Sequence, residues 1–227
     1  MKVIFLDIDG VIQPTWKQKR FEHLDEMDEM AKRLDAQIPG YEYYRYVTVE
    51  KYPGCVFTAY SRKCSLAAVC FDWDKDAVEY LRQVLEQHDA KIVISSDWRD
   101  GGEFTMKSFL AIYGLDKYFY DMLEGLSYRP PTERQARAQK YFGSVRKENQ
   151  RYDERAADIR DYLDLHKEVT AYVAVDDRNL GFPVAGHFVH CSRGMIRQEE
   201  FLQMKELIEI EDGPYPINYP LTDEKAV

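Results

Sequence analysis

The chain has 227 residues, of which 45% are hydrophobic and 31% charged, and its formal net charge at pH 7 is −9. This length and composition allow a buried hydrophobic core and exclude general disorder. The negative charge argues against general nucleic-acid binding, although a local basic patch remains compatible with it. No apolar run approaches the roughly 20 residues that span a bilayer, and the first residues lack a signal-peptide pattern, so we expect a cytoplasmic protein without membrane contact.

Three short apolar runs each lead into polar or acidic residues: 2–6 before Asp7, 91–94 before Ser95, and 170–175 before Asp176. Continuous hydrophobicity is typical of strands buried on both faces of a parallel sheet. Between these runs, apolar residues recur at helical spacing over 74–85, 104–113 and 153–165. The alternation predicts an α/β fold with a doubly wound, mostly parallel sheet, in which ligands bind at the carboxyl ends of the strands.

The region from residue 13 to residue 71 does not follow this alternation. Its pattern predicts a helix over 23–36 and short strands over 44–49, 56–60 and 66–71. We therefore expect residues 1–12 and 72–211 to form the catalytic core, with residues 13–71 as a small α+β insertion that acts as a lid or side lobe. A last strand over 187–191 and a helix over 197–210 complete the core, and three prolines predict a coil tail over 212–227.

Acidic residues follow two of the predicted central strands. Asp7 and Asp9 stand at alternate positions and point the same way, and Gly10 lets the chain turn after them. Such a pair can bind a hard cation, and one carboxylate can attack phosphorus. The adjacent Asp176 and Asp177 repel each other unless a cation or several donors compensate, which a magnesium ion shared with Asp7 would do. A solvated acidic turn is the alternative for both motifs.

Two further elements supply donors and positive charge. Ser95 and Ser96 offer hydroxyls and backbone N–H groups at a turn from strand to helix, an arrangement that binds anions; a simple helix cap is the alternative. A cation that balances a phosphoryl group should stand at the start of the helix before Asp176, where Arg155 lies. Lys147 and Arg151 compete for this role, and a surface ion pair is the alternative for each of the three.

These four elements, in this order, resemble the haloacid dehalogenase (HAD) superfamily of phosphohydrolases. Its pattern is D-x-D-x-[TV], a Ser or Thr, a Lys or Arg on a helix, and an acidic pair. More narrowly, the run Ser95-Ser96-Asp97-Trp98-Arg99, the helix over 155–163 and residues 188–195 resemble the HAD domain of bacterial RNA-repair proteins and its stand-alone relatives. The resemblance implies a Rossmann-like HAD core and does not cover the 13–71 insertion. The family usually has lysine at the third motif, where this chain offers Arg155, which keeps the charge.

The resemblance implies a magnesium-dependent phosphatase that works through an aspartyl-phosphate intermediate. Asp7 would attack phosphorus, and Asp9 would protonate the leaving oxygen and then activate water. Ser95, Ser96 and Arg155 would bind the phosphoryl oxygens. Mg²⁺ would be held by Asp7, by the backbone carbonyl of Asp9, and by Asp176 and Asp177, the last directly or through water.

Three hypotheses remain for the function. The first is a phosphatase acting on a small metabolite or nucleotide, the second a phosphatase acting on nucleic-acid ends, and the third a catalytically silent HAD-like binding module. The stretch 128–155 interleaves basic and aromatic residues, an arrangement that can line a substrate entrance and contact a nucleotide or a nucleic-acid end. Acidic residues within the same stretch make a solvated helix face the more ordinary interpretation. The oligomeric state is left open.

Overall fold

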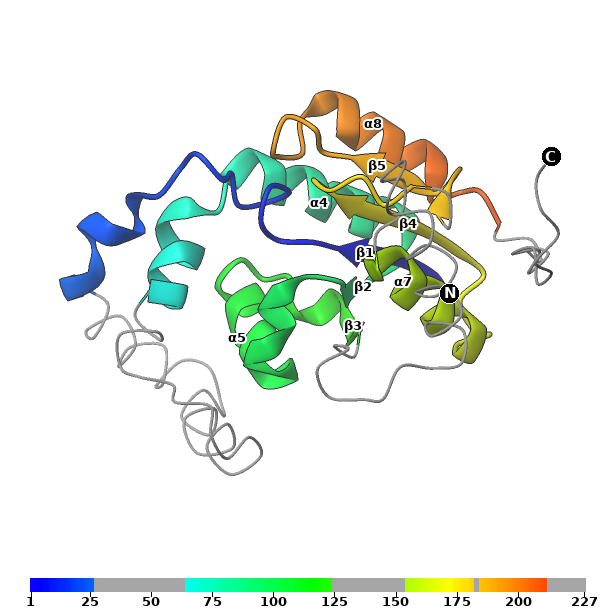
Figure 1. The fold of residues 1–227 in the computed structure, drawn as a ribbon, viewed down its shortest axis with the longest axis horizontal. Coiled ribbons are helices and arrows are strands. Elements are labelled where there is room, and N and C mark those ends of the chain that lie inside the picture. The colour runs from blue at the N-terminus through cyan, green and yellow to red at the C-terminus, as the bar shows by residue number, and fades with distance from the viewer. Residues whose placement is uncertain (27–63, 124–153, 182–183, 212–227) are drawn as a thin grey trace, which may run out of the picture.

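The computed structural model describes residues 1–26, 64–123, 154–181 and 184–211, which form a layered α/β structure (Figure 1). Within these residues one sheet has five strands in the order β3-β2-β1-β4-β5. Its strands are β1 (Lys2–Leu6), β2 (Ala90–Ile94), β3 (Phe119–Met122), β4 (Ala171–Asp176) and β5 (Phe188–His190). All four pairings are parallel. The predicted doubly wound parallel sheet is therefore confirmed.

Helices cover both faces of this sheet. They are α4 (Lys75–His88), α5 (Glu103–Ile112), α7 (Glu154–Leu165) and α8 (Gln198–Leu207). Short helical segments are η1 (Lys19–Glu22), η2 (Leu24–Glu26), η3 (Ala68–Asp72), η4 (Asp97–Gly101) and η5 (Asp116–Tyr118). No helix in the described ranges is long and apolar enough to cross a membrane.

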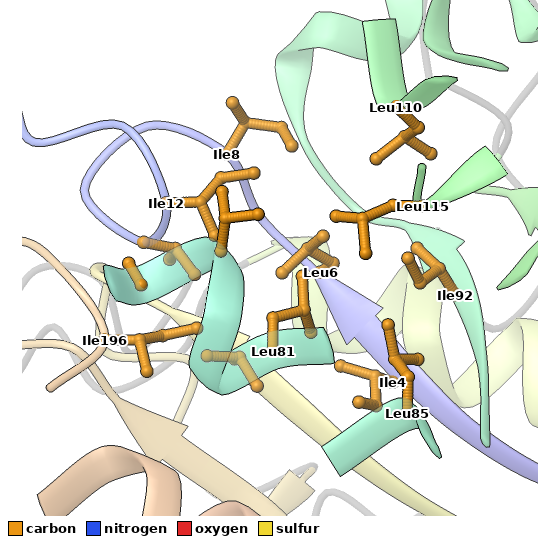
Figure 2. Packing of buried hydrophobic residues seen from close by; sticks show 14 of the residues in the cluster. Ile4, Leu6, Ile8, Ile12, Leu81, Leu85, Ile92, Leu110, Leu115 and Ile196 are labelled. Atoms are coloured by element: carbon orange, nitrogen blue, oxygen red, sulfur yellow. The ribbon is translucent and has the colours of Figure 1, made fainter. Parts of the chain in front are cut away.

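Alternate side chains of the central strand enter two separate cores. Ile4 and Leu6 of β1 pack with α4, α5 and α8, as Figure 2 shows for part of this cluster. Val3 and Phe5 point to the other face and pack with α7. Because side chains alternate along a strand, one apolar run fills both layers, and fully burying a Leu or Ile contributes about 1.5 to 3 kcal/mol.

The first of the covering helices, α4, shows how local sequence supports this packing. The Asp74 carboxylate caps the helix by accepting from the backbone N–H groups of Asp76 and Ala77 at 3.0 and 3.2 Å. Leu81 and Leu85 lie four residues apart on the buried face and are fully buried. The helix ends at Asp89, whose φ of 48° stops the helical pattern. The cap at Asp74 and the buried apolar face agree with the predicted helix over 74–85, and the helix runs three residues further, to His88.

The strand predicted over 66–71 is wrong. Residues 64–67 are α-helical and continue into η3, a π-helical turn that ends at Asp72. Leu66, Ala67 and Val69 pack in the first core cluster, so the run is apolar because the helix is buried. A short apolar run does not distinguish a buried helix from a buried strand, and the two alanines in this one favour a helix.

The edge strand β3 was not predicted. It contains Tyr120 and Asp121, and its burial is partial, so it lacks the continuous hydrophobicity of the central strands. Of the predicted helix over 23–36, residues 24–26 form the 3-10 segment η2. Outside the described residues lie residues 27–36 of that helix, the strands over 44–49 and 56–60, and the tail over 212–227. The division into core, insertion and tail stays a prediction.

Candidate active site

The sheet register brings the first and last motifs together at its carboxyl edge. The Asp7 backbone N–H donates to the carbonyl of Val175 at 3.0 Å, immediately before Asp176. On the other side of β1, the Ser95 N–H donates to the carbonyl of Leu6 at 2.9 Å. These two bonds continue the ladders of β1 with β4 and with β2. Asp7, Ser95 and Asp176 are therefore adjacent along one edge of the sheet.

A tight turn follows Asp7 and brings the chain against the second acidic motif. The backbone N–H groups of Val11, Ile12 and Gln13 all donate to the carbonyl of Ile8. Gly10 has a φ of +71°, and a Cβ added there would lie 2.2 Å from Asp177 Oδ2. Only glycine fits both the backbone conformation and this close approach. The glycine that the sequence placed at a turn thus also makes room for Asp177.

Three carboxylates form one group at this edge. Asp7, Asp176 and Asp177 each offer an oxygen, and these oxygens all lie within 4.8 Å of one another. Asp7 and Asp176 are buried, whereas Asp177 is half-buried. Several carboxylate oxygens at this spacing suit a hard divalent cation such as Mg²⁺ better than a soft metal. The donor set therefore fits the metal that the sequence predicted.

A buried guanidinium lies among these acids. Arg155, from the first turn of α7, places Nη1 at 2.8 Å from Asp7 Oδ2 and 2.6 Å from Asp176 Oδ2, and only 4% of its side chain is exposed. Its Nη2 is 3.3 Å from the exposed Asp97. Although burial alone would lower the pKa of Arg155, the charges of Asp7 and Asp176 raise it above the ordinary value. Arg155 is thus a permanent cation at the site; Lys147 and Arg151 lie outside the described residues.

The same burial raises the pKa values of two of these carboxyl groups, so that they do not all ionise readily together. Burial, reinforced by the negative charge of Asp7, raises the pKa of Asp176 to about 7, although Arg155 opposes the change. Burial and Asp7 also raise the pKa of Asp177. A cation that binds the ionised forms offsets this penalty. The electrostatics therefore favour a bound cation in addition to Arg155.

Asp9 is separate from this group and is held by two N–H donors. The indole Nε1 of Trp98 donates to Asp9 Oδ2 at 2.9 Å, and Nε2 of Gln13 donates to Oδ1 at 2.5 Å. Burial raises the pKa of Asp9, and the two donors oppose that rise. The sequence analysis gave Trp98 no role of its own and placed Gln13 at the start of the insertion. No pattern in the sequence identifies either as a partner of Asp9.

The two serines differ in their contacts. Ser95 is buried at the end of β2, and its N–H is used in the sheet ladder. The Ser96 hydroxyl accepts from the backbone N–H of Trp98 at 3.4 Å and so caps η4, which is the alternative that sequence reasoning left open. Contact of either serine with a phosphoryl group stays a prediction.

Residues 16–20, which follow the Asp7 turn, contact the core at three points. The Arg20 backbone N–H and guanidinium both donate to the fully buried Asp72 carboxylate. Lys17 lies 3.7 Å from Asp74. The Trp16 ring packs so closely on Gly194 that a Cβ added at Gly194 would lie 2.6 Å from it. This segment therefore has a defined place on the core.

One comparison with known proteins gives a match. A family model described as the HAD domain in Swiss Army Knife RNA repair proteins matches residues 3–199, a range that includes all seven predicted site residues. No curated protein and no solved structure gives a match.

Proposed function

The chain belongs to the family of HAD domains found in Swiss Army Knife RNA repair proteins, and we propose that it is a Mg²⁺-dependent phosphatase that hydrolyses a phosphomonoester through a phosphate bound covalently to Asp7. Family membership supports a hydrolase of the phosphatase type. The covalent route, the metal and the roles of single residues go beyond family membership and are argued below from the site.

The observation that carries the proposal is the setting of Asp7. Its carboxylate follows the buried residues 3–6 of β1 and contacts the guanidinium of Arg155 at 2.8 Å. A phosphate ester is an anion, and an anionic nucleophile reaches it only where positive charge offsets their repulsion. Arg155 supplies one such charge and has five N–H donors in a planar fork that suits phosphoryl oxygens.

In the first step, a carboxylate oxygen of Asp7 attacks phosphorus opposite the leaving oxygen. The new bond joins phosphorus to Asp7 while the ester P–O bond breaks, and Asp9 gives its proton to the departing alkoxide. Arg155 and the Ser95 hydroxyl bind the non-bridging oxygens. The product alcohol leaves, and the phosphate remains on Asp7.

In the second step, Asp9 takes a proton from a water molecule as that water attacks phosphorus. The bond between phosphorus and Asp7 breaks, which releases inorganic phosphate and restores the Asp7 carboxylate and the protonated Asp9. One residue thus serves as acid and then as base, so the proton balance closes over the two steps.

Asp7, Asp176, Asp177 and the backbone carbonyl of Asp9 are the groups that would hold Mg²⁺. When bound, the ion neutralises negative charge on the phosphoryl group. Three carboxylates with oxygens within 4.8 Å of one another support this assignment. The raised pKa of Asp176 supports it as well, since ionised carboxylates packed this closely need positive charge.

Small phosphorylated metabolites or nucleotides are the first substrate class. The family description favours a second class, a phosphorylated RNA end, because it places HAD domains of this family in RNA repair proteins. Either substrate presents a terminal phosphomonoester, and the chemistry described above is the same for both. The two classes differ only in what surrounds that phosphate.

Phosphate release tests the proposal. Wild-type protein should hydrolyse 4-nitrophenyl phosphate, a nucleoside monophosphate panel or an RNA oligonucleotide with a terminal phosphate, and a chelator should stop it. Asp7→Asn should remove turnover on every substrate, because an amide is not a nucleophile at phosphorus. Asp25→Asn, an exposed acidic residue in η2, is a matched control and should leave the rates unchanged. Turnover that persists in Asp7→Asn would exclude the covalent route.

A further inference from the structure

The Asp9 carboxylate is held at both of its oxygens by donors that cannot accept a proton. Trp98 Nε1 bonds one oxygen at 2.9 Å and Gln13 Nε2 bonds the other at 2.5 Å. Rotation of the carboxylate about its last torsion would break both bonds. Each oxygen accepts in two directions, so each keeps one direction open for a reacting proton. This arrangement therefore fixes the plane of Asp9 without blocking proton transfer.

The Trp98 side of this arrangement is itself fixed. The indole ring lies 6.1 Å from the ring of Trp73 and packs edge-on against Phe109 at 5.8 Å. Its backbone N–H is bonded to the Ser96 hydroxyl in the capped turn η4. A side chain locked by packing and by its own backbone gives its hydrogen bond a defined direction.

Core packing alone does not account for the Trp98 bond. Trp73 belongs to the same aromatic group and is more deeply buried, yet its Nε1 has no hydrogen-bond partner among the described residues. A tryptophan of this aromatic group thus packs without a bonded N–H at one position, and with one at the other. The hydrogen bond from the Trp98 N–H to Asp9 is therefore a feature of the site in addition to the packing of the ring.

Gln13 holds the other oxygen of the Asp9 carboxylate. It is 3% exposed, and its backbone is bonded in the turn after Asp7, with its N–H donating to Ile8 and its carbonyl accepting from Gly10. Its side-chain Oε1 has no partner in the part of the chain that the structure describes. The donation to Asp9 is thus the hydrogen bond that the buried amide makes there.

We infer that Trp98 is a positioning residue for Asp9, with Gln13 as its counterpart on the other carboxylate oxygen. The inference rests on the proposed function, since it assigns Trp98 to the step in which Asp9 protonates the leaving oxygen. Proton transfer requires hydrogen-bond reach in the transition state, and a carboxylate free to rotate spends less time in that geometry. Trp98 acts through Asp9, to whose Oδ2 its N–H donates.

Two aryl phosphates of similar shape test this role. Phenolate is a poorer leaving group than 4-nitrophenolate, so hydrolysis of phenyl phosphate depends more strongly on the proton from Asp9. Trp98→Phe keeps an aromatic ring in the cluster and removes the N–H. We expect it to lower kcat/KM about 10- to 100-fold for phenyl phosphate and less than about 3-fold for 4-nitrophenyl phosphate.

Trp73→Phe is the matched control, because it also removes an indole N–H from the same cluster but one without a partner. It should leave the ratio of the two kcat/KM values as in the wild type. If Trp98→Phe leaves the ratio of the two kcat/KM values as in the wild type, whether or not both values fall, the inference is overturned. If Trp98→Phe fails to fold, as judged by thermal unfolding, then Gln13→Met serves the same comparison through the other oxygen and should shift the ratio in the same direction.

Asp9→Asn separates this inference from the function on which it rests. A large loss on phenyl phosphate in Asp9→Asn, with a wild-type ratio in Trp98→Phe, would overturn the role of Trp98 alone. Wild-type rates in Asp9→Asn on both esters would overturn the proposed role of Asp9, and the role of Trp98 with it.

Discussion

Arg155→Met should strongly destabilise the metal-free protein, because it removes the cation between two buried carboxylates. Arg155 Nη1 is 2.8 Å from Asp7 and 2.6 Å from Asp176, and no more than 5% of any of the three side chains is exposed. Methionine keeps much of the apolar bulk without the charge. Removing one partner of a buried ion pair costs about 3 to 5 kcal/mol, since the remaining charge stays buried. For a chain of this size, the unfolding midpoint falls by about 6 to 20 °C.

Thermal unfolding in a chelator, and again with Mg²⁺, measures this effect. Mg²⁺ should restore part of the stability lost in Arg155→Met, because a cation bound by the same carboxylates favours the folded state by mass action. Lys107→Met is the control: Lys107 pairs with Glu103 at 2.7 Å, but the two side chains are 45% and 58% exposed. Its loss should be about 1 kcal/mol or less. An Arg155→Met midpoint equal to that of the wild type in the chelator would refute the electrostatic reasoning.

Three further predictions concern the turn, the acidic cluster and the segment after the turn. Gly10→Ala should weaken Mg²⁺ binding about 10- to 100-fold in an activity titration, because its Cβ would lie 2.2 Å from Asp177 Oδ2 and displace that carboxylate. The metal-free protein should lose stability in urea unfolding as the pH rises from about 4 through 7. Its Asp176 pKa is raised to about 7 from the usual 3.8, so the folded protein holds a proton that the unfolded chain releases. Arg20→Met should cost about 3 kcal/mol of unfolding free energy, because it leaves the fully buried Asp72 without its cation.

Each of these predictions has its own control. Gly102→Ala adds a Cβ at a φ of +83° with no described atom within 4 Å, so it carries backbone strain without displacing a ligand, and an equal loss of Mg²⁺ affinity there would contradict the reasoning about Asp177. Asp176→Asn should remove the Asp176 part of the pH slope; an unchanged slope would assign it to other groups. Lys17→Met removes an ion pair of 3.7 Å and should cost less than about 1 kcal/mol of unfolding free energy. A loss in Lys17→Met as large as that in Arg20→Met would contradict the claim that burial of Asp72 sets the size of the effect.

The central part of the fold was predictable because each of its strands is buried on both faces. Such strands are continuously apolar, and the helices between them carry an apolar stripe at regular spacing. The run over 66–71 was misread because a buried helix shows the same short apolar signal as a buried strand. The edge strand β3 was missed because an edge position tolerates Tyr120 and Asp121. An apolar run thus shows that a segment is buried, but it distinguishes a helix from a strand only where the apolar residues recur at a visible spacing.

The acidic cluster was predictable for a topological reason. Parallel strands end at the same edge of a sheet, so Asp7 and Asp176 must meet once β1 and β4 are neighbours. The partners of Asp9 were not predictable in the same way. Trp98 reaches Asp9 from 89 positions away in the sequence, and its bond depends on the direction of a ring packed on Trp73 and Phe109. Side-chain directions of this kind arise from tertiary packing, which motif spacing does not encode.

Detection of the phosphate on Asp7 tests the covalent mechanism most directly. Wild-type protein would be quenched in acid during turnover, treated with borohydride, which reduces an aspartyl phosphate to homoserine, and digested with trypsin. We expect a reduced residue at Asp7 in the peptide of residues 3–17, and no reduced residue at Asp9 in that peptide. Turnover without modification of Asp7, or with the modification at another carboxylate, would contradict the claim that Asp7 is the nucleophile.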